Sequence, residues 1–173
     1  KWFVEENIDQ KVGLVVKTNL AKNSLIDKSH CEKHFKMFLK DLPKDRKCKV
    51  YLLHGDMTDE EIHSLYLNEK LNAFVSLPHG EGFGLPLFEA AYSGMPVVTV
   101  GWSGQCDFLY DLEGKERFYN VAFDLHHVQE EAVWDGIIQK DSMWAFAREH
   151  SAKQCMRRCY EDVNAKTSTA SEY

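Results

Sequence analysis

Two glutamates lie eight residues apart in a stretch that reads HGEGFGLPLFEA, residues 79–90. Glu81 lies among three alternating glycines, and Glu89 lies in the apolar run that follows them. The glycines predict a loop, whereas residues 85–94, with a proline in the first turn and a glycine near the end, predict a helix. Carboxylates only accept hydrogen bonds, so two of them at such a junction suit the hydroxyl groups of a sugar and of a ribose.

The same junction can bind an anion. A glycine loop that opens a helix directs unpaired backbone N–H groups and the positive end of the helix dipole outward. Lys17 and Lys22 follow the first predicted strand and can neutralise a diphosphate. Taken singly, the glycines fit a tight turn and each lysine fits a solvated surface. Their coincidence at one edge of a sheet favours a binding site.

Short apolar, β-branched runs alternate with helical patterns along the chain. The predicted strands cover residues 12–16, 49–53, 72–77, 96–101 and 121–125. The predicted helices cover residues 24–40, a segment that starts at a capping box at 58–61, residues 85–94, and residues 128–163 with a break near 141–142. This alternation predicts a three-layer, Rossmann-like α/β fold, with a parallel sheet of five or six strands and helices on both faces. Ligands bind such sheets at the carboxyl ends of the strands, so the residues that follow the first three strands should meet there.

Composition excludes several classes of protein. The chain has 173 residues and a formal net charge of -6, which argues against nucleic acid as a partner. Its five cysteines are an odd number without a C-x-x-C pair, so we expect a reducing, cytoplasmic location rather than a disulfide framework. No apolar run approaches the roughly 20 residues of a transmembrane helix.

The stretch EGFGLPLFEAAYSGMPVV, residues 81–98, resembles the donor half of retaining glycosyltransferases of the two-Rossmann-domain type and is similar to glycosyltransferase family 4. That family carries two glutamates separated by seven residues in a frame like E-G-F-G-L-P-x-x-E-A-x-A-x-G-x-P-V-V. It also carries an arginine and a lysine five residues apart after the first strand, where this chain has Lys17 and Lys22. The stretch SGQCDFL, residues 103–109, is similar to the family's S/G-G-x-x-E-x-I turn, with Asp107 in place of the glutamate.

The resemblance implies a division of labour among these residues. Lys17 and Lys22 would neutralise the leaving diphosphate, Glu81 would hold the sugar hydroxyls, and Glu89 would bind the ribose. Catalysis would then be mainly stabilisation of the leaving group, with no metal and no cofactor beyond the donor substrate. The other residues expected to contact the donor are Gly82, Phe83, Gly84, Leu85, Met57 and His79.

The resemblance also implies a domain organisation. Residues 1–163 would form the domain that binds a UDP or GDP sugar, of the hexosyl-transferring type, and residues 164–173 would form a frayed or disordered tail. The chain begins with Lys1 rather than Met, so we expect a fragment. An N-terminal acceptor domain with a catalytic histidine would lie outside it, and the fragment alone would be inactive.

Two other functions stay open on the sequence. A dinucleotide-dependent oxidoreductase would carry G-x-G-x-x-G after its first strand, whereas this chain has G-x-G-x-G after the third. A degenerate, non-catalytic nucleotide-binding module is favoured by Lys17, because a lysine lacks the bidentate fork of the arginine that it replaces.

Two other groups of histidines and cysteines fit structural roles as well as functional ones. His30 and His34 lie one helical turn apart with Cys31 between them, which could bind a metal, but the usual third and fourth ligands are missing from the pattern. Cys155 and Cys159, four residues apart on a predicted helix, fit a buried apolar role.

Overall fold

The structure is a computed structural model that describes residues 1–21 and 23–170, so that Lys22 and residues 171–173 lie outside it. The side chains of residues 166–170 are also left undescribed. The chain divides into two compact units, Lys1–Ile62 and His63–Tyr173, and each is described by itself.

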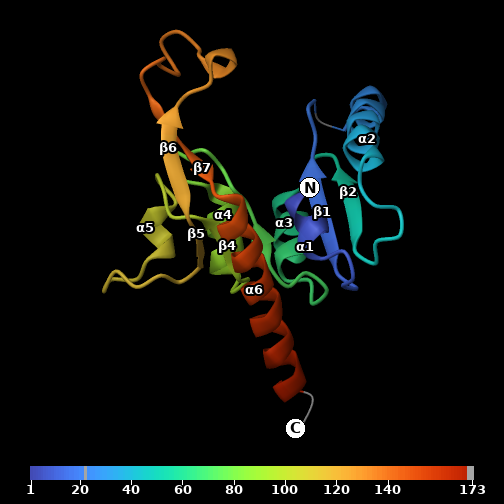
Figure 1. Ribbon diagram of the computed structural model, residues 1–173. Coiled ribbons are helices and arrows are strands. Elements are labelled where there is room, and N and C mark those ends of the chain that lie inside the picture. Colours follow the sequence, from blue (N-terminus) through green and yellow to red (C-terminus); the bar gives the residue numbers. More distant parts are fainter. Residues whose placement is uncertain (22, 171–173) are drawn as a thin grey trace. The chain divides into compact units, whose positions relative to one another are not determined.

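The first unit is built on a parallel pair of strands joined by a helix. Val15 lies opposite Tyr51 in the register of the two strands, and the connecting helix contacts the second strand (Figure 1). Because the strands are parallel, both end at the same edge of the sheet. The elements are α1 (Trp2–Glu6), β1 (Gly13–Thr18), α2 (Leu25–Lys40), β2 (Lys49–His54) and the start of α3 (Asp59–Tyr66), which continues into the second unit.

Local signals in the sequence explain where these helices begin. The Ser24 hydroxyl accepts a hydrogen bond from the Asp27 backbone N–H at 3.1 Å and caps α2. The predicted capping box of α3 is confirmed. Thr58 N–H donates to the Glu61 carboxylate at 2.8 Å, and Glu61 N–H donates to the Thr58 hydroxyl at 3.3 Å.

The second unit contains a three-stranded parallel sheet in the order β3-β4-β5 and an antiparallel hairpin of β6 and β7. All four residues of β4 are buried, which is typical of a central strand covered on both faces. The elements are β3 (Phe74–Val75), α4 (Leu85–Tyr92), β4 (Val97–Val100), α5 (Cys106–Leu109), β5 (Tyr119–Val121), β6 (Phe123–His127), the 3₁₀ turn η1 (Glu130–Ala132), β7 (Met143–Ala147) and α6 (Glu149–Ala170).

The core of the second unit lies where α4 packs on the parallel sheet. Buried side chains from α4, β4 and α5 meet there, and α6 contacts both β4 and β5. Cys155 and Cys159 on α6 are buried, as their predicted apolar role requires. The buried core cluster is formed by Leu87, Ala90, Met95, Val97 and Leu109.

The predicted helix over residues 128–163 is wrong in its first half. Residues 143–147 form β7, which pairs with β6, and the long helix starts only at Glu149. Trp144 and Phe146 lie two residues apart and therefore point to the same face of a strand, where both contact the ring of His79. This aromatic alternation favours a strand, and in Figure 1 residues 128–142 form the far end of the hairpin.

Three further predictions differ from the structure in extent. Within the described residues the parallel sheets have two and three strands, so the predicted single sheet of five or six strands is not seen. The predicted strand at 121–125 is divided between β5 and β6. The predicted frayed tail at 164–173 is wrong as far as residue 170, because helix α6 continues to Ala170. The last three residues of that tail, 171–173, lie outside the described residues.

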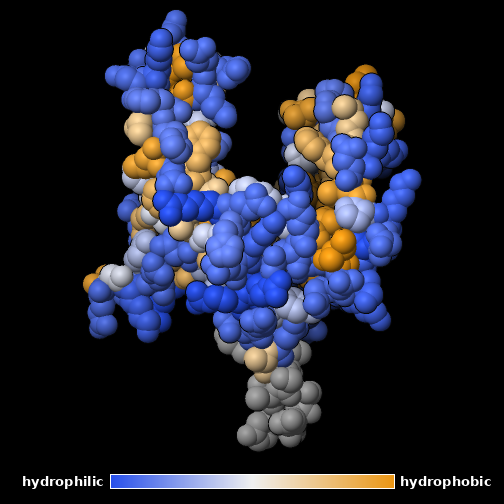
Figure 2. Space-filling view, in the orientation of Figure 1, coloured by the Kyte–Doolittle hydropathy of each residue, from blue (hydrophilic) through white to orange (hydrophobic). Residues whose placement is uncertain are grey.

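The surface is mostly hydrophilic in the view of Figure 2, with apolar side chains visible over α2. Among the exposed apolar residues of that helix are Leu25, Ile26, Met37 and Phe38. Among the helices of the described residues, none combines the length and the apolar character needed to cross a membrane.

Candidate functional site

The glycine loop that follows β3 is fixed to the loop that follows β4. The backbone carbonyl of Glu81 accepts two hydrogen bonds, one from the Ser103 hydroxyl at 2.8 Å and one from the Gly104 N–H at 3.0 Å. Strands β3 and β4 are parallel, so both loops leave the same edge of the sheet. The position of Glu81 is therefore set by a second loop 22 residues further along the chain.

This contact requires a glycine at position 104. A β-carbon on Gly104 would lie 2.0 Å from the carbonyl oxygen of Gly82, a distance that no side chain can adopt. The neighbouring Ser103 has a φ of 72°, in the left-handed region that is uncommon for a residue with a side chain. In the sequence, residues 103–109 stand out only through the family resemblance. The distance along the chain between Gly82 and Gly104 does not indicate that their backbones touch.

Helix α4 begins directly after the glycine loop, as predicted. Gly84 adopts a left-handed conformation with a φ of 86°, and its carbonyl accepts the first helical hydrogen bond from Phe88 N–H at 2.9 Å. Pro86 lies in the first turn. The first-turn N–H groups of Leu85 and Leu87 have no acceptor inside the helix, so this end can attract an anion.

The ring of Phe83 anchors the loop from the other side. It packs on Phe88 with ring centroids 5.4 Å apart and on Phe108 with centroids 5.1 Å apart. Phe83 is still 42% exposed. The loop thus has an apolar anchor on one side and hydrogen bonds from the loop after β4 on the other.

Glu89 is half-buried on α4 and lies close to the phenol of Tyr66 at the end of α3. Burial of the phenol, together with the nearby Glu89 carboxylate, raises the pKa of Tyr66 to about 12. The phenol donates a hydrogen bond to the Pro86 carbonyl at 3.2 Å, and its ring packs against Phe74. Tyr66 is a site residue that the sequence analysis did not single out, because its place in the apolar pattern of α3 indicated only packing.

His79 is held by the strand that the sequence analysis missed. Its Nδ1 lies 2.7 Å from the carbonyl oxygen of Ala145 in β7, and its own carbonyl accepts the Ala145 N–H at 2.9 Å. Its ring stacks on Trp144, with centroids 5.0 Å apart and planes inclined by 4°. A carbonyl oxygen can only accept, so Nδ1 carries a proton and Nε2 is the nitrogen left for another partner.

In the first unit, the loops that follow β1 and β2 meet, as expected for parallel strands. The Asn19 side-chain amide donates to Asp56 Oδ1 at 2.9 Å, and the Asp56 backbone N–H donates to Asn23 Oδ1 at 2.6 Å. Lys17 is exposed near the end of β1, and Met57 lies half-buried after β2. The predicted partner of Lys17, Lys22, lies outside the described residues.

The predicted site residues therefore form two groups. Lys17 and Met57 belong to the first unit, and the glycine loop, Glu89 and His79 belong to the second. Within each unit the loops after neighbouring parallel strands meet. The predicted meeting of the first strand end with the third, and with it the role of each residue, stays a prediction.

The two histidines of α2, which the sequence left as a possible metal-binding pair without further ligands, lie close together. His30 and His34 contact each other edge to face, with ring centroids 4.3 Å apart, and His34 Nδ1 bonds the His30 carbonyl at 2.9 Å. Both are exposed, whereas Cys31 is buried beside Asp27.

Parallel strands, connecting helices and a glycine loop that opens a helix define a mixed α/β domain of the Rossmann-like kind. The family model described as Glycosyl transferases group 1 matches residues 32–118, from the middle of α2 to just before β5. This match spans half of the chain, so the chain belongs to that family and is a glycosyltransferase domain. Comparisons with curated proteins and with solved structures give no match.

Proposed function

We propose that this chain is the donor-binding half of a retaining, two-domain glycosyltransferase similar to family 4, and that it binds the UDP or GDP conjugate of a hexose. Membership of the group 1 family supports glycosyl transfer in general. The observation that carries the donor role is the fixed loop of Glu81, held by Ser103 and Gly104 directly before the helix that bears Glu89.

The diphosphate would be neutralised by cations and by backbone dipoles. Lys17 is exposed near the end of β1 and can act as a point charge, as can Lys22 in the proposal. The first turn of α4 adds the N–H groups of Leu85 and Leu87. Stabilising the departing diphosphate lowers the barrier to transfer without a metal ion at that position.

The two glutamates would bind the two sugars of the donor. Glu81 is proposed to hold hydroxyl groups beside the anomeric carbon, and Glu89 to accept hydrogen bonds from the diol of the ribose. Tyr66 lies close to Glu89, and its neutral phenol leaves the Glu89 carboxylate as the charged group of the pair. The remaining proposed contacts are the backbone of Gly82, Phe83 and Gly84, the Nε2 atom of His79, and Met57 near the base.

By the family resemblance, a separate acceptor domain would supply the acceptor site and a catalytic histidine. Residues 1–173 alone would then bind the donor in the cytoplasm without transferring the sugar.

A ligand panel tests the proposal. We expect UDP or GDP, or their sugar conjugates, to raise the melting temperature of the chain, since a ligand at 100 times its Kd stabilises the fold by about 2.7 kcal/mol. Glu89→Gln should weaken binding by about tenfold, because one lost charge-assisted hydrogen-bond partner is worth about 1.5 kcal/mol. Glu69→Gln is the matched control, since Glu69 is exposed and lies outside the proposed site.

The same ligand panel distinguishes the proposed donor site from the two other functions that the sequence left open. No shift with any nucleoside diphosphate at millimolar concentration would contradict a donor site. Binding of NAD or NADP without a preference for UDP or GDP would favour an oxidoreductase. If Glu81→Ala and Glu89→Ala left every affinity unchanged, the chain would be a degenerate module that keeps the fold alone.

A further inference from the structure

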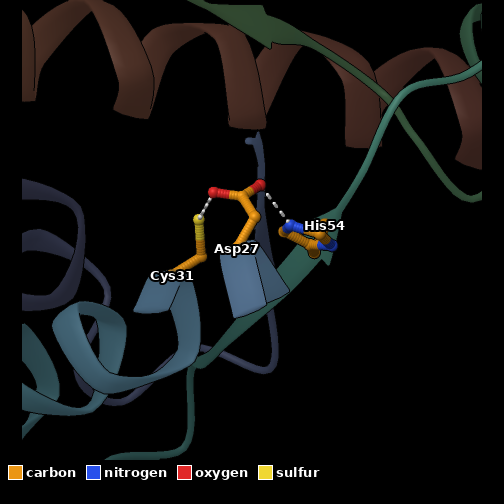
Figure 3. Close-up of side chains that lie close together, drawn as sticks. All are labelled: Asp27, Cys31 and His54. Carbon is orange, nitrogen blue, oxygen red and sulfur yellow. Dashed lines mark hydrogen bonds and ion pairs between the residues drawn. The ribbon is translucent and has the colours of Figure 1, made fainter. Parts of the chain in front are cut away.

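A carboxylate, a thiol and an imidazole gather in the first unit, where His54 pairs in register with Thr18 at the end of β1. Asp27 and Cys31 lie four residues apart on α2 and so share one face of the helix, and His54 is the last residue of β2 (Figure 3). One potential ligand atom from each lies within 4.8 Å of the others. We propose that these three side chains bind one divalent transition-metal ion, with Zn²⁺ the best fit.

The distances are close to those of a tetrahedral zinc site. His54 Nε2 lies 2.8 Å from Asp27 Oδ2, and Cys31 Sγ lies 3.8 Å from Asp27 Oδ1. With bonds of about 2.0 Å to nitrogen and oxygen and about 2.3 Å to sulfur, ligand atoms around tetrahedral zinc are about 3.3 to 3.5 Å apart. These two pairs lie within about half an ångström of the tetrahedral separations, and the Cys31 sulfur and the His54 nitrogen lie within 4.8 Å of each other, so the side chains must draw together around the ion.

The site is buried, and its carboxylate is held in place. Asp27 is 5% exposed and Cys31 7% exposed, and the side chain of His54 is 9% exposed. The Leu20 N–H lies 3.2 Å from each oxygen of the Asp27 carboxylate. Such an outer hydrogen bond orients a metal ligand before the ion arrives.

A dication also balances the charge of the cluster. With the thiol protonated and the imidazole neutral, Asp27 leaves one negative charge in a buried place, and burial of a charge is costly. When the ion binds, the thiol loses its proton to solvent. His54 Nε2 gives up the proton that it donates to Asp27, and the neutral imidazole then carries its single proton on Nδ1. The thiolate and the carboxylate then neutralise the two positive charges of the ion.

The ligand types and the surroundings favour zinc over a harder cation. A thiolate and an imidazole suit Zn²⁺, whereas Mg²⁺ and Ca²⁺ prefer oxygen ligands. Three protein ligands leave a fourth position for water. His54 also borders a cavity of about 270 Å³ beside α2, which provides a path from solvent. The other residues that line this cavity are Lys28, Glu32, Phe35, Lys36 and Leu52.

Cobalt is the probe for the proposed site. We expect the full chain, stripped with a chelator, to bind one equivalent of Co²⁺, with a thiolate-to-cobalt charge-transfer band and the visible bands of tetrahedral coordination, and to exchange it for Zn²⁺. Cys31→Ser should abolish the charge-transfer band. His54→Gln should weaken cobalt binding by more than about tenfold, since the loss of even an outer partner of a ligand commonly costs that much.

Two matched variants control for binding elsewhere. Cys106→Ser removes a half-buried thiol of the second unit, and His34→Gln removes an exposed imidazole one turn from Cys31. Both should keep the full cobalt spectrum. Loss of the spectrum in either variant, or its persistence in Cys31→Ser, would overturn the assignment.

If the ligand variants do not fold, measurements on the unmodified chain still test whether Asp27, Cys31 and His54 bind a metal ion. No charge-transfer band at one equivalent of Co²⁺, or an equal rise of the melting temperature in Zn²⁺ and in Mg²⁺, would show that Asp27, Cys31 and His54 are only a hydrogen-bonded group. No nucleotide is present in these measurements, so their outcome is independent of the proposed donor site.

Discussion

Gly104 lies so close to Gly82 that a β-carbon at position 104 would come within 2.0 Å of the Gly82 carbonyl oxygen. Together with the bonds to the Glu81 carbonyl, this contact fixes the shape of the glycine loop from outside the loop itself. The geometry of the candidate site therefore depends on a residue that need not touch any ligand.

Gly104→Ala should disturb both stability and donor binding. The added methyl group meets backbone atoms that cannot rotate away, so we expect a loss of about 1 to 3 kcal/mol in the free energy of unfolding, as for other overpacked sites. Denaturant unfolding measures it. Gly82→Ala is the control for stability, because a β-carbon there meets nothing within 4 Å. Equal effects of the two substitutions would contradict the close contact.

The phenol of Tyr66 should titrate only at high pH. Its pKa in the folded state is raised to about 12, so the stability that this group contributes is present below pH 10, the ordinary pKa of a tyrosine, and is lost as the pH rises through about 12. Spectrophotometric titration of the unmodified chain against Tyr66→Phe isolates this group. Glu89→Gln should lower the pKa only in part, because burial is the larger cause of the shift. A phenol that titrates near pH 10 would contradict both the burial of Tyr66 and its proximity to Glu89.

His79→Phe separates the packing of His79 from its chemistry. A phenyl ring can keep the stack on Trp144, whereas the hydrogen bond to the Ala145 carbonyl and the Nε2 atom are lost. If Nε2 contacts the donor, calorimetry should show affinity reduced about fivefold, the value of one hydrogen bond of about 1 kcal/mol. Unchanged affinity with lowered stability would make His79 a structural residue only.

Lys17 offers a test of the diphosphate role. Lys17→Ala should weaken binding of a nucleoside diphosphate by about tenfold or more at low salt, and the difference should shrink as salt screens the charge. Lys17→Arg should bind at least as tightly as the unmodified chain, because the guanidinium can contact phosphate with two parallel hydrogen bonds. Lys11→Ala is the control, since Lys11 is exposed and precedes β1. If Lys17→Ala bound the diphosphate as tightly as the unmodified chain, Lys17 would not belong to the site.

Local signals predicted much of the fold. The β-branched runs, the capping box of α3 and the proline of α4 correctly located most of the strands and helices as far as α4 and β4. The prediction was wrong at β7, because the apolar run of residues 143–147 was included in a long helix, although its alternating Trp144 and Phe146 favour a strand. The pairing with β6 establishes the strand, and pairing is a long-range property.

The candidate site was predicted in its residue types but not in its supports. Glu81, Glu89 and the glycine loop are visible as a local motif. Tyr66 lies 23 residues before Glu89 and Ser103 lies 22 residues after Glu81, and neither spacing indicates contact. His54 is likewise 27 residues from Asp27, so the cluster that it completes becomes evident only when α2 and β2 are placed side by side. Spacing along the chain records local geometry, whereas these contacts arise from the packing of whole elements.

The β6–β7 hairpin touches His79 through residues 144–146, close to its base, while the turn at Gly136 belongs to the far end of the hairpin. Gly136 and Ile137 are exposed, and a β-carbon on Gly136 would meet nothing within 4 Å. The outer turn is therefore a natural place to attach a fluorescent reporter, which would leave the histidine anchor intact while following the hairpin during ligand titrations.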